Sequence, residues 1–401
     1  MVSLMPFPIR RPWLMTRGAM TDRNQPPFDR LRSIDDPDEF LWAILPHAAR
    51  SFAPSILLLP EEAARTTAVG YLYARMLDTY EDLSSTPADA RHALSAFAAR
   101  FQHGRPGIAP PAPIPTGPDN RDRAHLLLIE RHPLVDESFL ALAAADQRRV
   151  VRLITEMAAG MSEFSTLFEE QGGVLHSDEQ VLGYCDRVIG LPALFVLELL
   201  LGEPTDQHSR DGLEVAELIQ LANITRDIEK DLTRGVAYHR ALEPHLRAGR
   251  TDDASAAVAL ARHDLLKLAG ERAPSFRRLV GSSNLSRVSV IRSAAVIMML
   301  FTHGHYRSQT GRVRGRHLPR RVTSMFLMAL PASVSPRWAN WVLRRIEEDL
   351  DAMSGSWDSQ AHVARQHSVA VPGGRARSGH AVNQPRGSAV HRPVRARDAR
   401  R

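Results

Sequence analysis

Apolar residues recur at every third or fourth position along most of the chain between about Phe40 and Trp357. This spacing is typical of amphipathic α-helices, in which such residues share one face. No segment shows the alternation of apolar and polar residues that predicts a β-strand. The pattern therefore indicates an all-α fold, with helices expected at Pro37–Ala49, Pro60–Leu83, Pro87–Gln102, Leu134–Glu169, Asp178–Leu201, Gly212–Arg234, Asp252–Gly270, Ser289–Ser308 and Pro336–Met353.

One segment interrupts this pattern without dividing the protein. Gly104–Pro118 contains six prolines, which cannot continue a helix, so we expect an exposed connection there. The same helical pattern resumes beyond it, and the chain has no internal repeat. The simplest organisation is one helical domain over residues 36–357, with a flexible segment at 1–35 and a disordered tail at 358–401.

Composition allows a large core but places the positive charge at one end. The 401 residues are 44% apolar and carry a net charge of +6. Nine arginines and one aspartate lie in Arg365–Arg401, a net of +8, which leaves −2 for the rest of the chain. This segment has no aromatic residue for base stacking, so no nucleic acid is expected as a partner. A solvated tail and a peripheral contact with anionic lipid headgroups both stay open.

The number of cysteines and the lengths of the apolar runs indicate the cellular compartment to expect. Cys185 is the single cysteine, so no internal disulfide can form. The longest apolar runs, Leu191–Leu197 and Ala294–Phe301, are far shorter than the roughly 20 residues that span a bilayer. Prolines and arginines interrupt the N-terminus before an apolar stretch of signal-peptide length develops. We expect a cytoplasmic protein, with any membrane contact peripheral to the inner face.

The first cluster of candidate chemistry is acidic. Asp78, Glu81 and Asp82 stand at i, i+3 and i+4 in a predicted helix, so their carboxylates share one face. Like charges at this spacing destabilise an isolated helix, so a compensating cation is expected nearby. Taken alone, the segment also fits a solvated acidic face at a helix end.

A second acidic helix favours a metal over that alternative. Asn223, Asp227 and Asp231 stand at i, i+4 and i+8 and offer three oxygen ligands on one face. Magnesium prefers a few carboxylate or amide oxygens together with water and phosphate oxygens. Two such helices facing each other across a cavity would hold Mg²⁺ against a diphosphate and help it to leave. The apolar segments Val150–Met161 and Leu191–Leu201 could wall a dry pocket for a hydrocarbon chain.

Five motifs, in order, make the chain from about Arg50 to Tyr238 similar to the squalene and phytoene synthase family of head-to-head prenyl transferases. They are Arg50-Ser51-Phe52, Asp78–Asp82, Met157–Met161, Tyr184–Gly190 and Asn223–Asp231. The first acidic motif, Asp-Thr-x-Glu-Asp, resembles squalene synthases more than phytoene synthases. The resemblance implies a helical bundle of the isoprenoid-synthase type around a central cavity.

The resemblance also implies roles for individual residues. Asp78, Glu81 and Asp82 would form the first Mg²⁺ site, and Asn223, Asp227 and Asp231 the second. Arginines and the Arg50 segment would hold substrate diphosphates, as the planar guanidinium suits phosphate oxygens. Tyr184 would handle a proton after the first coupling, and Tyr71 lies near the family's active site. The residues expected to bind diphosphate are Arg50, Ser51, Phe52, Arg75, Arg226 and Arg234.

The sequence departs from the family pattern at three places. The aromatic-proline turn that usually follows the second acidic motif is here Tyr238-His239-Arg240, which keeps the tyrosine and loses the proline. Val236 stands where the family generally has a diphosphate-binding arginine, with Arg234 two positions earlier as a candidate replacement. Beyond about Ala248, we identify no clear counterpart of the segment that completes the reducing step of squalene synthases. His303, His305 and Tyr306 lie in that part of the chain, where a lone histidine is more often structural than catalytic.

The expected activity is Mg²⁺-dependent condensation of two farnesyl diphosphates through presqualene diphosphate to squalene, with NADPH as an open second cofactor. Open alternatives are a halt at presqualene diphosphate, capture of the cation as hydroxysqualene, use of geranylgeranyl diphosphate to make phytoene, or cyclisation of one substrate. A non-catalytic relative serving as an assembly subunit is also open. Intact carboxylates on both helices favour an enzyme, since a scaffold gains nothing from clustered negative charge.

Overall fold

The computed structural model describes residues 14, 22, 25–112, 119–248, 254–286, 288–309, 318–319 and 321–369, with side chains as far as Met353. Most of the predicted N-terminal segment, the end of the proline-rich connection at 113–118 and the tail from 370 lie outside the described residues, so the predictions for them stand untested.

Helices make up the described fold. They are α2 (Phe28–Arg32), α3 (Pro37–Ala48), α4 (Ala53–Leu57), α5 (Glu61–Leu83), α6 (Pro87–Ala99), α7 (Asn120–Glu130), α8 (His132–Leu140), α9 (Ala144–Glu170), α10 (Asp178–Cys185), η2 (Asp186–Gly190), α11 (Leu191–Leu201), α12 (Asp206–Thr233), η3 (Arg240–Leu242), α13 (Glu243–Ala248), α14 (Ser255–Ser282), α15 (Val290–Gln309), α16 (Val322–Ala329), η4 (Leu330–Ser333) and α17 (Pro336–Val369). Within the described ranges, β pairing is limited to an isolated bridge between Val174 and Ala237. The predicted all-α class is confirmed.

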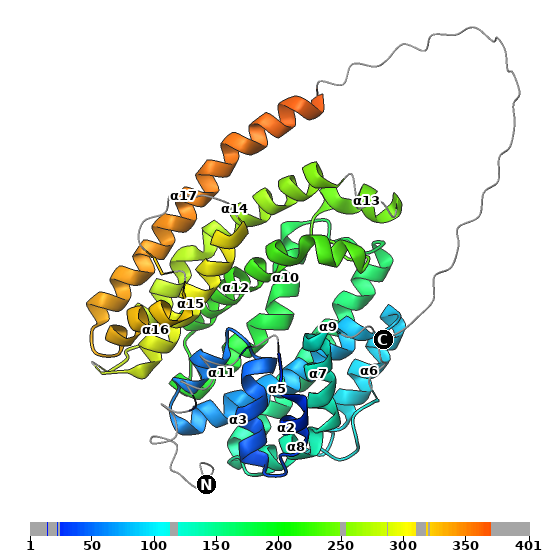
Figure 1. Cartoon of the computed structure of the whole chain (residues 1–401), viewed down its shortest axis with the longest axis vertical. Helices are drawn as coiled ribbons and strands as arrows, with labels where there is room; N and C mark the ends of the chain where they lie inside the picture. Colours follow the sequence, from blue (N-terminus) through cyan, green and yellow to red (C-terminus); the bar gives the residue numbers. More distant parts are fainter. Residues whose placement is uncertain are drawn as a thin grey trace, which may run out of the picture.

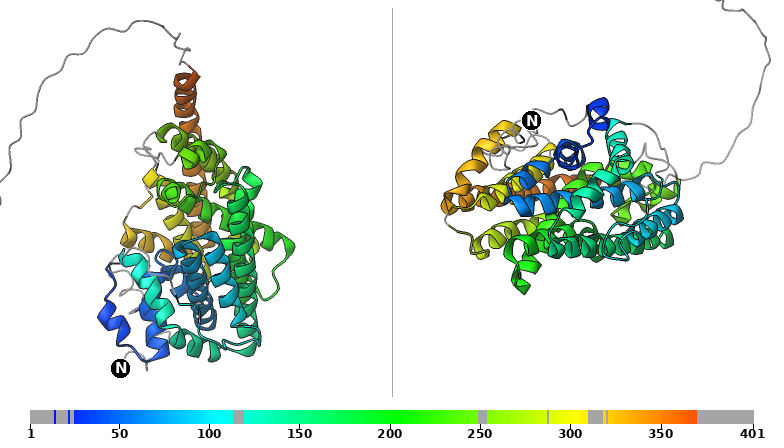
Figure 2. Two further views of the ribbon diagram at one scale, coloured as in Figure 1. Left: turned by 90° about the vertical axis from the view of Figure 1, so that its right-hand side faces the viewer. Right: turned by 90° about the horizontal axis from the view of Figure 1, so that it is seen from below.

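The helices pack in two groups that share one core. Figure 1 shows the first half of the chain, from α2 to α9, gathered at one side of the molecule and the second half, from α12 to α17, at the other. Helix α5 packs on α6, α9 and α11, while α12 packs on α11, α14 and α15. Figure 2 shows the long helices of both groups running close together when the molecule is turned. The two acidic helices therefore belong to different groups.

Several predicted helix boundaries were wrong, among them the end of α14, which continues to Ser282 rather than Gly270, and two of the others have a local reason. The segment predicted as one helix, Leu134–Glu169, is two helices, α8 and α9. The side chain of Gln147 donates to the carbonyl oxygens of Leu140 and Leu142, which satisfies groups left open where α8 ends. Helix α12 begins at Asp206, six residues before the predicted start, because Thr205 and His208 form a reciprocal capping box.

The predicted terminal segments are more ordered than expected where the structure describes them. Residues Phe28–Arg32 form α2, and the side chains of Leu31 and Ile34 are buried in the core, so the flexible segment predicted for 1–35 ends earlier. Helix α17 continues to Val369, so residues 358–369, assigned to a disordered tail, are helical. None of the described helices combines the length and apolarity needed to cross a bilayer.

Close packing explains a glycine beside the cavity. A Cβ atom on Gly160 of α9 would lie 2.6 Å from Cδ of Arg187, closer than such atoms approach. Arg187 belongs to η2, a π-helical turn between α10 and α11, and π-turns in helices are frequent at functional sites. Gly160 therefore allows α9 to lie directly against this turn, next to Tyr184.

Candidate active site

A cavity of about 770 Å³ lies between the two helix groups. Ligand pockets for small molecules fall in the range of about 300–1,000 Å³. One part of its wall carries charged side chains from α5, α7 and α12, and another part is apolar. All fourteen side chains predicted to form the site line it: Arg50, Ser51, Phe52, Tyr71, Arg75, Asp78, Glu81, Asp82, Tyr184, Asn223, Arg226, Asp227, Asp231 and Arg234. Their roles stay predictions.

On α5, the first carboxylate is held by an arginine of the same helix. Arg75 Nη1 lies 3.0 Å from Asp78 Oδ2, and Arg75 Nη2 donates to the Tyr71 hydroxyl at 2.8 Å. Burial opposes the charge on Arg75, but Tyr71 and Asp78 outweigh it and raise the pKa of the guanidinium. Arg75 is therefore a fixed cation in the wall and supplies the compensation expected from the sequence.

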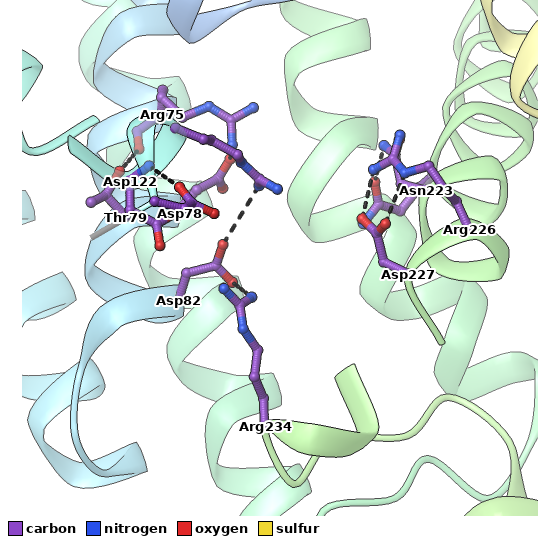
Figure 3. Close-up of polar contacts among 12 residues, drawn as sticks. Arg75, Asp78, Thr79, Asp82, Asp122, Asn223, Arg226, Asp227 and Arg234 are labelled. Atoms are coloured by element: carbon purple, nitrogen blue, oxygen red, sulfur yellow. Dashed lines mark hydrogen bonds and ion pairs between the residues drawn. The ribbon is translucent and has the colours of Figure 1, made fainter. Parts of the chain in front are cut away.

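The second carboxylate of α5 is reached from other parts of the fold. Arg234, just after α12, donates from Nη1 to Asp82 Oδ1 at 3.0 Å, and Arg121 of α7 lies 4.0 Å from Asp82 Oδ2. Figure 3 shows Asp82 below Asp78 on the same helix, with Arg234 reaching up to it. Asp82 thus joins α5 to the end of α12 through one ion pair.

On α12, neighbouring residues pair with each other. Arg226 donates from Nε to Asp227 Oδ1 at 2.8 Å and from Nη2 to Asp227 Oδ2 at 2.6 Å. Asn223 donates from Nδ2 to Gln220 Oε1 at 3.1 Å, which leaves its carbonyl oxygen for another partner. Figure 3 shows Asn223 and Asp227 across from Asp78 and Asp82. The two oxygen-rich faces therefore lie on opposite sides of the cavity.

Burial sets the protonation of these carboxyl groups differently. Desolvation raises the pKa of Asp78 to about 6 and that of Asp231 to about 7, and it raises the pKa of Glu81 well above its usual value. Asp227 is also partly desolvated, but its hydrogen bonds from Arg226 lower its pKa. Asp227 therefore stays ionised without a metal, whereas Asp231 needs a cation to hold its charge near neutral pH.

The donor set fits Mg²⁺ only in combination with substrate. Within the described ranges, no three His, Cys, Asp or Glu side chains converge closely enough to hold a metal ion alone. Magnesium is usually bound through one or two carboxylates together with water and substrate phosphates, rather than by a complete protein cage. The separate oxygen donors on α5 and α12 match that mode, since a diphosphate between them would supply the remaining oxygens.

Aromatic rings surround Tyr184 at the edge of the charged wall. The Tyr184 ring centroid lies 5.2 Å from that of Tyr238 and 5.6 Å from that of Phe164. Burial raises the pKa of Tyr184, and the nearby Glu81 and Tyr238 raise it further. The phenol therefore keeps its proton, so it is suited to donate a hydrogen bond or to present its ring to a cation.

The Arg50 segment is a strained turn between α3 and α4. Arg50 has a φ angle of +48°, which non-glycine residues seldom adopt. Desolvation lowers the pKa of Arg50, and the cations Arg121, Arg226 and Arg75 lower it further. Backbone strain of this kind concentrates at functional sites, where the surrounding structure holds it in place. The strained turn brings Arg50 and Phe52 to the wall, where the Phe52 ring lies 5.6 Å from Tyr71.

Several cavity residues were not singled out from the sequence. Arg121 and His125 come from α7, a helix missed because its pattern follows the proline-rich connection. Lys230 lies on α12 between the predicted metal ligands Asp227 and Asp231. Its place on this acidic face is the feature of the sequence from which it could have been identified. Arg121 could not be found this way, since nothing in the local sequence connects it with Asp82.

His303 and His305, which were noted beyond Ala248, have different surroundings. His303 is buried and its Nε2 lies 2.8 Å from Asp349 Oδ2, away from the cavity lining. Its neighbour Tyr306 is also buried and donates to the carbonyl of Leu218. His305 lines the cavity, with Nδ1 3.5 Å from Arg226 Nη1, and desolvation and Arg226 lower its pKa to about 4. The expected structural role suits His303, whereas His305 is a neutral cavity residue.

The apolar part of the cavity is deep and comes mostly from four helices. Its wall includes side chains of α11, α12, α14 and α15: Val196, Leu197, Leu200, Val215, Ile219, Phe276, Leu279, Ile291, Ala294 and Met298. Of the two apolar segments proposed as walls, Leu191–Leu201 contributes many side chains, and Val150–Met161 contributes Met157. The cavity therefore joins a charged end to an extended apolar end.

Curated proteins resemble about half of this chain. A curated squalene synthase of Solanum lycopersicum is 27% identical over 195 residues, covering 48% of this chain and 44% of the relative. A lycopaoctaene synthase of Botryococcus braunii is 27% identical over 210 residues, and an inactive squalene synthase 2 of Arabidopsis thaliana is 25% identical over 198 residues. The chain spans less than half the length of these curated relatives.

Solved structures show the same fold. One described as "The complex structure of TcSQS with ligand, BPH1237" matches with a TM-score of 0.61 at 19% identity, covering 82% of this chain and 98% of the other. The family model described as squalene/phytoene synthase matches residues 45–301, which include all fourteen predicted site residues. The chain therefore belongs to the squalene/phytoene synthase family, whose enzymes are Mg²⁺-dependent and act on prenyl diphosphates.

Proposed function

We propose that the protein condenses two farnesyl diphosphates head to head into presqualene diphosphate, with loss of one diphosphate and a proton, and converts this to squalene by loss of the second diphosphate and addition of a hydride from NADPH. The observation that carries the proposal is the placement of Asp78 and Asp82 opposite Asn223 and Asp227 in a cavity that continues into an apolar wall. A prenyl diphosphate has the same division into a charged head and a hydrocarbon chain.

The charged end suits departure of a diphosphate. Arg50, Arg75 and Arg226 line it together with the carboxylates, and permanently charged guanidinium groups hold phosphate oxygens in fixed positions. Bound Mg²⁺ would supply charge stabilisation for the leaving diphosphate. Asp78, Asp82, Asn223 and Asp227 would hold the cation, with Glu81 and Asp231 as supporting groups. The wall is therefore arranged to stabilise the charge that ionisation creates.

The apolar end suits the coupling that follows. An allylic cation from the first substrate alkylates a double bond of the second, and a proton leaves as the cyclopropane ring of presqualene diphosphate closes. Side chains such as Leu197 and Phe276 exclude water that would capture the cation. Tyr184 and Tyr71 also line the cavity and offer phenol rings and hydroxyls. We assign proton handling to Tyr184 and cation stabilisation to Tyr71.

The experiment is incubation of the purified full chain with farnesyl diphosphate and Mg²⁺, with and without NADPH, followed by mass spectrometry. Presqualene diphosphate without NADPH and squalene with it are the expected products. Presqualene diphosphate or hydroxysqualene in both reactions would support the first half of the proposal and overturn the second. Phytoene from geranylgeranyl diphosphate alone would assign a different substrate. No turnover of either diphosphate would contradict the proposed enzyme.

A further inference from the structure

Exposed apolar side chains gather at one end of the molecule. Eight large hydrophobic residues are exposed in the described structure, and six belong to a small region made by the start of α15, by α16, η4 and the start of α17. We call these six the apolar patch: Val288, Val290, Leu327, Leu330, Val334 and Trp341. Leu327 is the most exposed, at 70%. Scattered apolar residues are normal on a surface, but a concentration of them on segments that pack together points to an interaction site.

Hydrogen bonds hold these segments together as one surface. The Ser289 amide donates to the Ser333 carbonyl at 2.7 Å, which places Val288 and Val290 beside η4. Buried Arg292 donates to the carbonyls of Ala332 and Ser333, and Trp338 donates to the carbonyl of Met328. Figure 1 shows α16 packed beside α15 and α17 at the lower left of the molecule. The patch is therefore a fixed feature of the fold.

The segments that carry the patch are basic as far as Ile346, and acidic residues begin at Glu347, where Glu348 pairs with Arg345 at 3.0 Å. The sequence from Leu318 to Ile346 contains five arginines and no aspartate or glutamate. Arg321, Arg337 and Arg344 are exposed, and Arg345 lies over the ring of Trp341 at 6.0 Å. Trp341 itself stacks on Trp338 with ring centroids 4.9 Å apart. Apolar residues with tryptophan and a basic surround are the combination that binds at an anionic bilayer surface.

The patch also adjoins the apolar end of the cavity. Leu285 and Ile291 line the cavity, and in the chain they flank Val288 and Val290 of the patch. The lining continues from there along α15 through Ala294 and Met298 to His305 at the charged end. The apolar end of the cavity thus reaches the part of the surface where the apolar patch begins.

We propose that the apolar patch docks on an anionic lipid bilayer, with the patch side chains among the acyl chains and Arg321, Arg337 and Arg344 against lipid phosphates. None of these residues belongs to the Arg-rich segment Arg365–Arg401. Docking here turns the apolar end of the cavity toward the membrane, the phase in which a long hydrocarbon dissolves. The inference rests on surface residues and does not need the proposed reaction to be correct.

The test measures binding of the full chain to vesicles of phosphatidylcholine with and without phosphatidylglycerol, by sedimentation. Leu327→Gln/Leu330→Gln should weaken binding to anionic vesicles by about tenfold to a hundredfold, because two exposed leucines no longer leave water. The matched control is Ile108→Gln, since Ile108 is 64% exposed but lies in the proline-rich connection. It should leave binding unchanged. Arg337→Gln/Arg344→Gln should reduce the preference for anionic vesicles.

The outcomes separate this proposal from its competitors. Every variant carries the tail, so equal binding by wild type and Leu327→Gln/Leu330→Gln would assign membrane contact to the tail and overturn the proposal. A dimer by analytical ultracentrifugation that the double variant disrupts, with vesicle binding unchanged, would make the patch an interface between two copies. Asp78→Asn should bind vesicles as wild type does, so loss of catalysis and loss of docking are distinguishable.

Discussion

The two helices that bring carboxylates to the cavity balance their charge in different ways. On α12, Asp227 is held by the adjacent Arg226 in a two-point pair, so its charge is stabilised within the helix. On α5, Asp82 depends on Arg234 and Arg121, which come from distant parts of the chain. Each acidic face therefore carries a cation of its own helix, Arg226 on α12 and Arg75 on α5, but Asp82 of α5 meets its partners only when the protein folds. The difference assigns a structural duty to Arg234, since it ties the end of α12 to α5.

The largest expected effect comes from removing one carboxylate charge on either helix. Asp78→Asn and Asp227→Asn should each lower turnover of farnesyl diphosphate by about a thousandfold, because several kcal/mol of cation-mediated stabilisation is lost. Turnover and circular dichroism should be measured together, and the helical content should stay unchanged. Matched controls are Glu62→Gln at the exposed start of α5 and Glu229→Gln, which removes a carboxylate paired with Arg262. Near-normal turnover in either aspartate variant would show that the reaction does not require the carboxylates of both helices.

The second-largest effect is expected at Arg234, whose ion pair with Asp82 links the end of α12 to α5. Arg234→Gln removes the hydrogen bond to Asp82 and one cation of the cavity wall, so KM should rise by about tenfold, the scale of a charged hydrogen bond. Arg234→Lys should recover part of the loss, since it keeps the charge without the planar fork. Steady-state kinetics with varied farnesyl diphosphate provide the measurement. If Arg234→Gln left KM unchanged, Arg234 would only be a surface partner of Asp82.

A smaller effect is expected on thermal stability. It has opposite signs for Asp231 and Asp227 of α12. Desolvation raises the pKa of Asp231 to about 7, so the folded protein binds more protons than the unfolded chain between about pH 4 and 7. Ionised Asp231 therefore costs stability as pH rises through that window, and Asp231→Asn should raise Tm at pH 8. Asp227 has a lowered pKa and stabilises the fold once ionised, so Asp227→Asn should lower Tm at pH 8.

Thermal melts of the metal-free protein at pH 5 and pH 8 test this contrast. At pH 5 Asp231→Asn should approach wild type, because Asp231 is then protonated in the folded protein. Asp227→Asn should stay below wild type at both pH values, because a carboxyl group with a lowered pKa is still ionised at pH 5. Added Mg²⁺ with inorganic diphosphate should raise the Tm of wild type more at pH 8, because a cation binds the ionised carboxylates. Equal shifts for Asp227→Asn and Asp231→Asn would contradict the different charge environments on α12.

The smallest effect is expected at Val236. The family generally has a diphosphate-binding arginine there, but Val236 is absent from the cavity lining, and Arg234 lies in it. Val236→Arg should therefore change KM and product ratio by less than about twofold, below the scale of one hydrogen bond. In the Arg234→Gln background the same substitution should show whether an arginine at 236 can substitute. A large gain from Val236→Arg alone would mean that Arg234 does not fill the missing role.

The fold was predictable where local patterns decide it and less so elsewhere. Helical periodicity located the core of α5 and α12, because burial of one face dominates a long helix. The break between α8 and α9 was missed, since a glutamine side chain closes it and apolar residues continue through it. The short helices α4 and α7 were also missed. These few turns are held mainly by packing against other helices.

The sequence by itself determined which residues share a face. Asp78 and Asp82 lie four residues apart, as do Asn223 and Asp227, and the geometry of an α-helix fixes the rest. Only the tertiary structure decided which cations meet these carboxylates and how much water reaches them. Arg121 and Arg234 reach Asp82 across long stretches of chain, and burial moves the pKa of Asp78 and Asp231 toward neutrality. Helical spacing is local and repeats along any sequence, whereas charge pairing and desolvation depend on the packing of segments that are remote in the chain.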